Sequence, residues 1–304
     1  MKTYLECIPC FFKQALEASK ICGAEVDVQK EILDDVARAI PGFDLNSSPP
    51  AMGRTIHKIV KKHTGIEDPY EDIKEKSNRL ALGVYEKLKK KLDNHEDRLR
   101  SAVELAIAGN IIDYGVKNSL DVNGELEKIL KKEHKAIENE NDTFFNYDIF
   151  FKTLSRSKHI LYLADNAGET VFDSILIEEI LRRDKDKEIV YAVKEEPIIN
   201  DALIEDAFLC GIDKMAKVIS SGSDAPGTIL SICSKDFLTL FEHADMVISK
   251  GQGNFEALSS SKRDIFFLFM AKCHVIAEDV GCNVGDVLLI CNTINKRLSQ
   301  YAQK

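Results

Sequence analysis

Two neighbouring residues, Asp165 and Asn166, place oxygen ligands directly after a short apolar run, in the segment HILYLADNAGE. The run predicts a buried parallel strand that ends at this pair, and ligands of open α/β sheets bind at that end of the strands. Carboxylate and amide oxygens suit a hard divalent cation such as Mg²⁺ or Mn²⁺, and Co²⁺ or Ni²⁺ is also compatible. Capping of the next helix is the ordinary alternative. Because Gly168 and Glu169 follow the pair at a strand end, we favour a metal site.

A second aspartate, Asp201 in the segment IINDALIED, could supply a further carboxylate to the same metal. We expect it to start the helix that follows the next strand, since Asp is a frequent first residue there. At this position, helix capping alone explains the aspartate at least as well as metal binding does.

Another strand-end segment, VISKGQGNFE, combines a lysine with two glycines. Gly251 and Gly253 would let the backbone approach a ligand closely, the next helix would present its N-terminus to an anion, and Lys250 would add a positive charge. The segment is not a dinucleotide-binding fingerprint, because Glu256 stands where a third glycine would be needed. A plain glycine-rich turn is the alternative.

Asn110 and Asp113 lie three residues apart in an apolar helical segment, SAVELAIAGNIID, and therefore share one helical face. Buried polar groups need hydrogen-bond partners. The two residues could satisfy backbone groups between helices, or they could face a cleft. Either Asp113 or Glu169 could act as the base that positions an attacking water, and the sequence does not choose between them.

Cys7 and Cys10 form a CxxC motif near the start of the chain, and Cys273 with His274 could complete a zinc site. A redox motif of the thioredoxin type would follow a strand, whereas this one opens a helix. A disulfide framework is not expected in a chain of this length without a secretion signal. We therefore rank a structural or thiol–metal role above redox catalysis.

These candidate residues need a scaffold that brings several strand ends together, and the second half of the chain has the pattern for one. Short β-rich runs alternate with helical runs, which predicts a Rossmann-like, three-layer α/β/α domain with a mostly parallel sheet over residues 151–304. Residues 1–150 are expected to form an all-helical domain packed on it, with the acidic run 138–142 as the linker. The expected strands are 160–164, 189–193, 217–220, 245–249, 265–270 and 287–291. The expected helices between them are 169–183, 199–210, 227–242, 254–259 and 271–280.

The composition of the 304 residues is that of a globular protein, with 44% hydrophobic and 30% charged residues and a formal net charge of -9. An acidic chain gains no electrostatic advantage from nucleic acid or an anionic membrane, so we exclude both as partners. No apolar run approaches the ~20 residues that span a bilayer. The N-terminus resembles a mature helix more than a signal peptide, so we expect a cytoplasmic protein. Its oligomeric state is open.

The motifs CIPC, DPY, GNIID, DNAGE, IIND and KGQGNFEAL occur in this order over essentially the whole chain. Together they resemble the DUF89 family, also called ARMT1-like or damage-control phosphatases, and the CxxC indicates its short prokaryotic branch. The resemblance implies a metal-dependent phosphatase of small phosphorylated metabolites, such as sugar phosphates or damaged phospho-metabolites. It also implies metal ligands at Asp165, Asn166 and Asp201. The residues that it implies for the substrate cleft are Asn110, Asp113, Lys250 and Asn254.

Under this hypothesis, the metal would activate a water that attacks the phosphoryl group. Lys250 and the backbone N–H groups near Gly251 and Gly253 would stabilise the charge on that group. Direct attack by Asp165 is less favoured, because Ala167 stands where Asp-x-Asp phosphatases carry a second aspartate.

Two alternatives belong to other functional classes. The first is an S-adenosylmethionine-dependent carboxyl methyltransferase, although the usual glycine-rich loop after the first strand is missing. The second is a non-enzymatic thiol–metal sensor that uses Cys7, Cys10 and Cys273.

Overall fold

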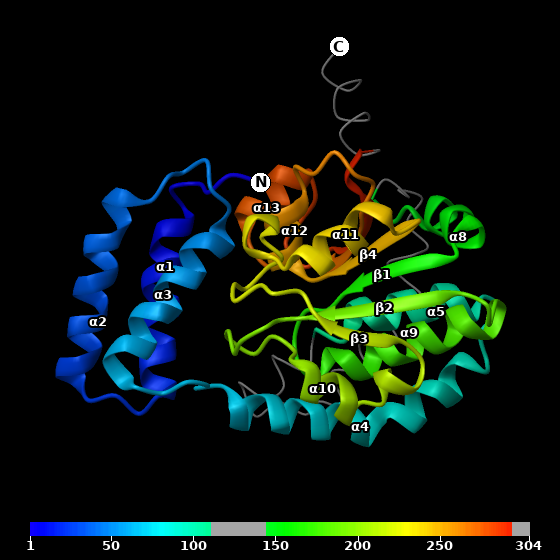
Figure 1. The fold of residues 1–304 in the computed structure, drawn as a ribbon, viewed down its shortest axis with the longest axis horizontal. Coiled ribbons are helices and arrows are strands. Elements are labelled where there is room, and N and C mark those ends of the chain that lie inside the picture. The colour runs from blue at the N-terminus through cyan, green and yellow to red at the C-terminus, as the bar shows by residue number, and fades with distance from the viewer. Residues whose placement is uncertain (111–143, 294–304) are drawn as a thin grey trace, which may run out of the picture.

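A six-stranded sheet forms the centre of the protein in the computed structural model, which describes residues 1–110 and 144–293. The strand order is β3-β2-β1-β4-β5-β6, and all neighbours run parallel except β6, which is antiparallel to β5. Each predicted strand is present to within one residue at either end, and the predicted α/β class is confirmed (Figure 1). The strands are β1 (His159–Leu163), β2 (Glu188–Val193), β3 (Lys217–Ser220), β4 (Met246–Lys250), β5 (Phe266–Met270) and β6 (Val287–Cys291).

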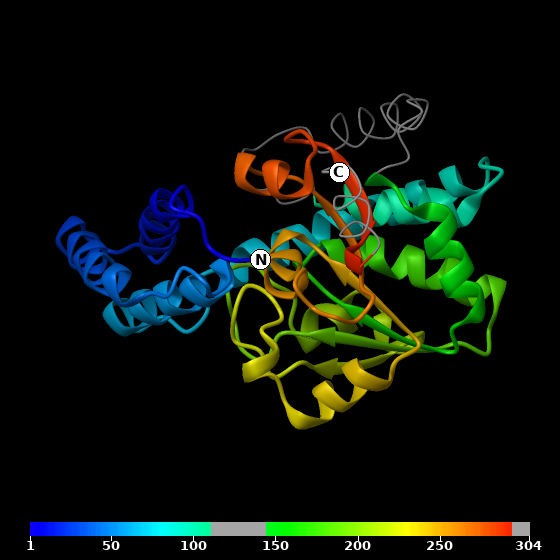
Figure 2. The ribbon, with the colours of Figure 1, turned by 90° about the horizontal axis from the view of Figure 1, so that it is seen from above.

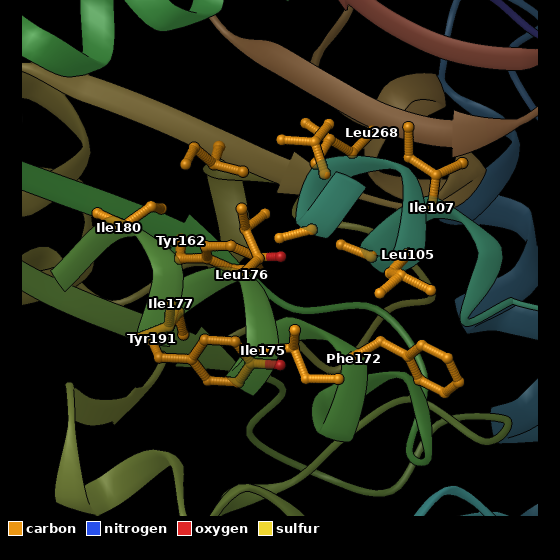
Figure 3. Close-up of a cluster of buried hydrophobic side chains, with 14 of the residues drawn as sticks. Leu105, Ile107, Tyr162, Phe172, Ile175, Leu176, Ile177, Ile180, Tyr191 and Leu268 are labelled. Carbon is orange, nitrogen blue, oxygen red and sulfur yellow. The ribbon is translucent and has the colours of Figure 1, made fainter. Parts of the chain in front are cut away.

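Helices cover both faces of the sheet, because successive side chains of each buried strand point to opposite sides. In β1, Ile160 and Tyr162 belong to one hydrophobic cluster, whereas Leu161 and Leu163 belong to another. Figure 3 shows the first cluster, in which the β1 and β2 tyrosines pack under α9. The helices of the first face are α4 (Glu71–Leu92), α5 (Arg98–Ala108), α8 (Tyr147–Arg156), α9 (Glu169–Arg183) and α10 (Ile204–Leu209). The helices of the second face are α11 (Lys235–His243), α12 (Gln252–Leu258) and α13 (His274–Val280).

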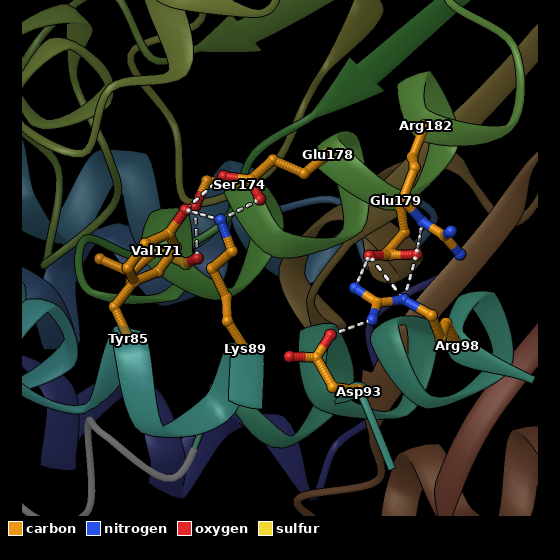
Figure 4. Close-up of polar contacts among 9 residues, drawn as sticks. All are labelled: Tyr85, Lys89, Asp93, Arg98, Val171, Ser174, Glu178, Glu179 and Arg182. Atoms are coloured by element: carbon orange, nitrogen blue, oxygen red, sulfur yellow. Dashed lines mark hydrogen bonds and ion pairs between the residues drawn. The ribbon is translucent and has the colours of Figure 1, made fainter. Parts of the chain in front are cut away.

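Polar contacts as well as apolar packing hold α4 and α5 against α9 (Figure 4). Lys89 Nζ of α4 lies 2.7 Å from Glu178 Oε2, and Arg98 Nη2 of α5 lies 2.6 Å from Glu179 Oε1. Glu179 is buried, so its pairing with Arg98 offsets the cost of removing the carboxylate from water. These contacts fix α9, the helix that starts at the DNAGE turn, from its outer side.

The first three helices, α1 (Cys7–Ile21), α2 (Val26–Ala39) and α3 (Pro49–Thr64), form a bundle with its own hydrophobic cluster (Figures 1 and 2). Gly65 ends α3 in a left-handed conformation with φ 69°, which suits glycine. Because α4 packs on α9, and α5 packs on α9 and the sheet, the helices of residues 1–110 divide between two hydrophobic clusters. The domain boundary expected near residue 150 remains a prediction.

Three predicted helices begin later than expected, and the prediction that Asp201 starts a helix is wrong. The helix predicted over 271–280 begins at His274. The helix predicted over 199–210 begins only at Ile204, because residues 200–202 pair with the loop after β1. The helix predicted over 227–242 begins at Lys235, where the side chain of Ser234 accepts a hydrogen bond from the Phe237 N–H.

Asp113 and the predicted linker 138–142 lie outside the described residues. None of the helices in the two described ranges is both long and apolar enough to span a membrane.

Candidate active site

The C-terminal ends of β1 and β4 meet at the point where the strand order reverses. β1 lies between β2 and β4, and the chain builds outward on one side through β2 and β3 and on the other through β4 and β5. Such a switch point is where open α/β sheets bind ligands. It brings Asp165 and Asn166, after β1, beside Lys250 and Gly251, at the end of β4.

The loops that carry Asp165, Asn166 and Asp201 are joined by backbone hydrogen bonds. Ala202 N donates to Asp165 O at 2.8 Å, and Ala167 N donates to Asn200 O at 2.9 Å. Between these bonds, Asn166 and Asp201 form an isolated antiparallel bridge. The structure therefore brings the three predicted metal ligands together, although Asp201 arrives on a bridge and not on a helix.

Asp165 lies in a buried group of carboxylates. Burial raises its pKa well above the ordinary value, and the negative charges of Glu169 and Asp201 raise it further, against Lys272 and Lys194. A divalent cation would relieve this repulsion. The described residues contain no group of three or more His, Cys, Asp or Glu side chains placed to hold a metal. The predicted donor set is of another kind, two carboxylates and one amide, and fits a hard cation.

Hydrogen bonds fix the amide of Asn166. Its Nδ2 donates to Glu169 Oε1 at 2.9 Å and to Asp165 Oδ2 at 3.2 Å. The pKa of Glu169 is lowered, so its carboxylate is ionised and can only accept, and the NH₂ group of Asn166 must face it. The amide oxygen of Asn166 consequently points away from Glu169.

Glu169, the first residue of α9, uses both carboxylate oxygens in hydrogen bonds. Oε1 accepts from Asn166 and from Asn110 Nδ2, the latter at 2.7 Å, and Oε2 accepts from Lys250 Nζ at 2.9 Å. Burial acts to raise the pKa of Glu169, but Lys250, Lys272 and these hydrogen bonds outweigh it and lower the pKa. Glu169 is therefore held ionised, with hydrogen bonds to both of its oxygens.

The side chain of Lys250 is buried at the edge of the sheet and does not face solvent. Its side chain is 1% exposed, and Nζ contacts Asp173 Oδ1 at 2.9 Å as well as Glu169. Burial acts to lower the pKa of Lys250, but Asp173 and Glu169 outweigh it and raise the pKa. The predicted point charge is present at the site, where two protein carboxylates already bind it.

The two glycines of this segment make room for protein groups. A Cβ on Gly251, where φ is 80°, would overlap the carboxylate of Asp165, and a Cβ on Gly253 would overlap the carbonyl oxygen of Pro226. Gly251 thus permits the close approach of a predicted metal ligand to the β4 backbone. Gly253 permits the contact between α12 and the loop that contains Pro226.

Asn254 joins three segments around the site. Its Nδ2 donates to Ala164 O at 2.9 Å and to Lys250 O at 2.8 Å, and its Oδ1 accepts from the N–H and the hydroxyl of Thr228, both at 2.8 Å. Lys194 Nζ lies 3.4 Å from the same Oδ1. The predicted substrate-lining residue therefore holds β1, β4 and the Thr228 loop in place.

A family model described as the damage-control phosphatase ARMT1-like domain matches residues 3–288. The chain belongs to this family. It is 38% identical over 293 residues to "Uncharacterized protein MJ0202" of Methanocaldococcus jannaschii, covering 94% of each chain. It is 36% identical over 295 residues to "Damage-control phosphatase PH1575" of Pyrococcus horikoshii, covering 96% of this chain and 99% of that one.

The crystal structure of that Pyrococcus horikoshii DUF89 family protein has the same fold, with a TM-score of 0.84 and 33% identity. The alignment covers 96% of this chain and 99% of that chain. The resemblance stated from the motifs is confirmed, and with it the phosphatase class and the helical and Rossmann-like architecture.

Several polar residues around this ARMT1-like site escaped the sequence analysis. Asp173 lies one helical turn after Glu169, in the otherwise apolar stretch VFDSILI, and a lone carboxylate there was the available signal. Asn78 of α4 accepts a hydrogen bond from Gly168 N at 2.6 Å and so supports the turn before α9. Lys194 and Lys272 follow β2 and β5; the strand-end pattern places both at this edge of the sheet, although the sequence assigned them no individual role.

The cysteines predicted as a second metal site are free thiols in the structure. Cys7 and Cys273 are half-buried and Cys10 is exposed, and among the described side chains they do not assemble into a group that could hold a metal. Cys273 instead lies 3.8 Å from Gln252 Nε2, at the start of α12.

Proposed function

We propose that this protein is a divalent-metal-dependent phosphatase that hydrolyses small phosphorylated metabolites, such as sugar phosphates. The observation that carries the proposal is the donor set at the switch point: Asp165, Asn166 and Asp201, on two loops joined by backbone hydrogen bonds. These three residues would hold Mg²⁺, Mn²⁺, Co²⁺ or Ni²⁺. When bound, the metal would supply a Lewis acid for the phosphoryl oxygen and a more acidic water.

The chain's own residues divide the remaining tasks. Glu169 orients the amide of Asn166, because its Oε1 accepts the Asn166 hydrogen bond. Both oxygens of Glu169 already accept hydrogen bonds, so we assign the water-positioning base to Asp113, the other candidate that the sequence offers. We assign the phosphate-binding cation to Lys272, which follows β5, is half-buried, and acts on the pKa values of both Asp165 and Glu169. A cation there would offset charge on the transferring phosphoryl group.

Phosphate release tests this proposal. Metal-stripped protein is incubated with a panel of sugar phosphates and an aryl phosphate, each with Mg²⁺, Mn²⁺, Co²⁺ or Ni²⁺. We expect release that requires a metal, that falls at least a hundredfold in Asp165→Ala, and that falls mainly through a higher KM in Lys272→Met.

The matched control is Asp213→Ala, which removes an aspartate of the short helical turn Ile212–Lys214, outside the set of residues assigned to the site. It should retain the parent activity. Metal-independent release, or full activity in Asp165→Ala, would contradict the assignment of the site.

A further inference from the structure

A second carboxylate lies beneath the site and is fully enclosed. Asp173 of α9 is 0% exposed and accepts three hydrogen bonds. They come from the hydroxyl of Tyr162 at 2.7 Å, the hydroxyl of Tyr191 at 2.7 Å and Lys250 Nζ at 2.9 Å. The two tyrosines, on β1 and β2, stack with ring centroids 5.3 Å apart and lie side by side in Figure 3.

Further hydrogen bonds connect Asp173 to Asn166, one of the proposed metal ligands. Lys250 Nζ, held by Asp173, also donates to Glu169 Oε2 at 2.9 Å. Glu169 Oε1 in turn accepts from Asn166 Nδ2. Three hydrogen bonds therefore join Asp173 to Asn166, and they pass through Lys250 and Glu169.

The two tyrosines hold the Asp173 end of this series of hydrogen bonds in place. A hydroxyl on each oxygen of Asp173 leaves that carboxylate one orientation, and Tyr162 and Tyr191 belong to adjacent, hydrogen-bonded strands. A lysine side chain has about four rotatable bonds, so by itself it does not fix the position of its Nζ atom. Asp173 supplies the missing constraint, because Lys250 Nζ must lie between two carboxylates in a volume closed to water.

We infer that Asp173 is a positioning residue of the phosphatase, which through Lys250 and Glu169 fixes the Asn166 amide for the divalent cation. The inference rests on the proposed function. It assigns a role in metal binding to a residue that does not touch the metal, the substrate or the proposed ligands. Loss of an outer partner of a metal site typically weakens metal binding by 10- to 100-fold.

The test measures Mn²⁺ binding directly, by the electron paramagnetic resonance signal of free Mn²⁺ in a titration of the full chain. Asp173→Asn is nearly the same size but is uncharged, and we expect it to raise the Kd for Mn²⁺ at least tenfold. In a Lys250→Met background the same substitution should change the Kd less than twofold, because the connection through Lys250 is already broken.

Two further variants each remove only a hydroxyl group and control for misfolding. Tyr191→Phe removes one hydroxyl from Asp173, and should raise the Kd in the same direction by a smaller factor. Tyr147→Phe removes a hydroxyl from another buried tyrosine that binds a carboxylate, Asp97, at 2.8 Å, and should leave the Kd unchanged. Thermal unfolding of each variant separates loss of fold from loss of binding.

The Asp165→Ala variant distinguishes an error in the proposed metal site from an error in the role given to Asp173. If Asp165→Ala abolishes Mn²⁺ binding while Asp173→Asn and Tyr191→Phe bind like the parent, the role of Asp173 is overturned and the proposed site stands. An equal effect of Asp173→Asn with and without Lys250 would also overturn it. If Asp165→Ala binds Mn²⁺ normally, the metal site itself is wrong.

Discussion

The Cα of Gly251 lies so close to the carboxylate of Asp165 that a Cβ there would overlap both of its oxygens. Gly251 also has φ 80°, a conformation that L side chains rarely adopt. One glycine thus provides two things, a left-handed turn after β4 and space for a carboxylate from β1. The relationship explains why the end of β4 matters to a metal site whose proposed ligands all lie elsewhere.

Gly251→Ala should abolish metal binding and activity, because the methyl group would push the Asp165 carboxylate out of place. We expect at least a hundredfold loss of phosphatase activity and a Mn²⁺ Kd raised at least tenfold. Gly281→Ala is the control, since Gly281 has φ 86° with nothing within 4 Å of the added Cβ. It should cost about 1 kcal/mol of stability and leave activity intact. Similar activity losses in both variants would show that backbone strain, and not the overlap, is responsible.

Asn254→Asp should destabilise the fold although the side chain keeps its shape. The new carboxylate oxygen would face the carbonyl oxygens of Ala164 and Lys250, which now accept from Nδ2. Lys194 and Thr228 would still contact the other oxygen, but the loss of both Nδ2 hydrogen bonds and the repulsion between buried oxygens should cost about 1–3 kcal/mol, measurable by urea unfolding. Asn94→Asp, at an exposed position after α4, should change the free energy of unfolding by less than about 0.5 kcal/mol. An equal, small change in both would contradict the role given to Asn254.

At Ile199 we expect the glycine variant to be more stable than the alanine variant, which reverses the usual order. Its φ is 48°, an unusual value for a β-branched residue, and its side chain packs on the cluster formed by α1, α2 and α3. Both substitutions lose that packing, but glycine also relieves about 1 kcal/mol of strain. Ile199→Gly should therefore be the more stable variant in urea unfolding.

The neighbouring Ile198 is the matched comparison, because it is buried and does not have positive φ. There the alanine variant should be the more stable one, by about 0.5–1 kcal/mol. The same order at both positions would argue against strain at Ile199, which lies two residues before the proposed ligand Asp201.

Glu104 of α5 should make stability depend on pH. Burial raises its pKa to about 7, against the opposing effect of Arg100. A carboxyl with a raised folded-state pKa favours the folded state while it is protonated. This contribution is complete below the unfolded-state pKa of about 4.5 and is lost as pH rises to about 7. The loss amounts to up to about 3 kcal/mol.

Glu104→Gln removes this titration. The variant should be more stable than the parent above about pH 7, and the advantage should vanish near pH 4.5. Urea unfolding of both proteins at several pH values measures the difference. A difference that does not change with pH would show that Glu104 titrates normally in the folded protein.

The sequence by itself determined the strands, the family and the placement of chemistry at one edge of the sheet. Apolar runs bounded by polar residues predict buried strands because a parallel sheet needs both faces covered. The β4 pattern also predicts the face on which Lys250 lies. Met246 and Ile248 pack on the α9 face, so the two-residue period of a strand assigns Lys250 to the same face.

Only the tertiary structure decided which partners these residues have. Lys250 meets Glu169 and Asp173 from a helix about 80 residues earlier in the chain, and Tyr191 reaches Asp173 from a third element. Asp201 was misplaced on a helix because its backbone pairing with Asn166 is a long-range contact that no local preference encodes. Local pattern fixes the face on which a side chain lies, whereas the charge that it meets there depends on how distant elements pack.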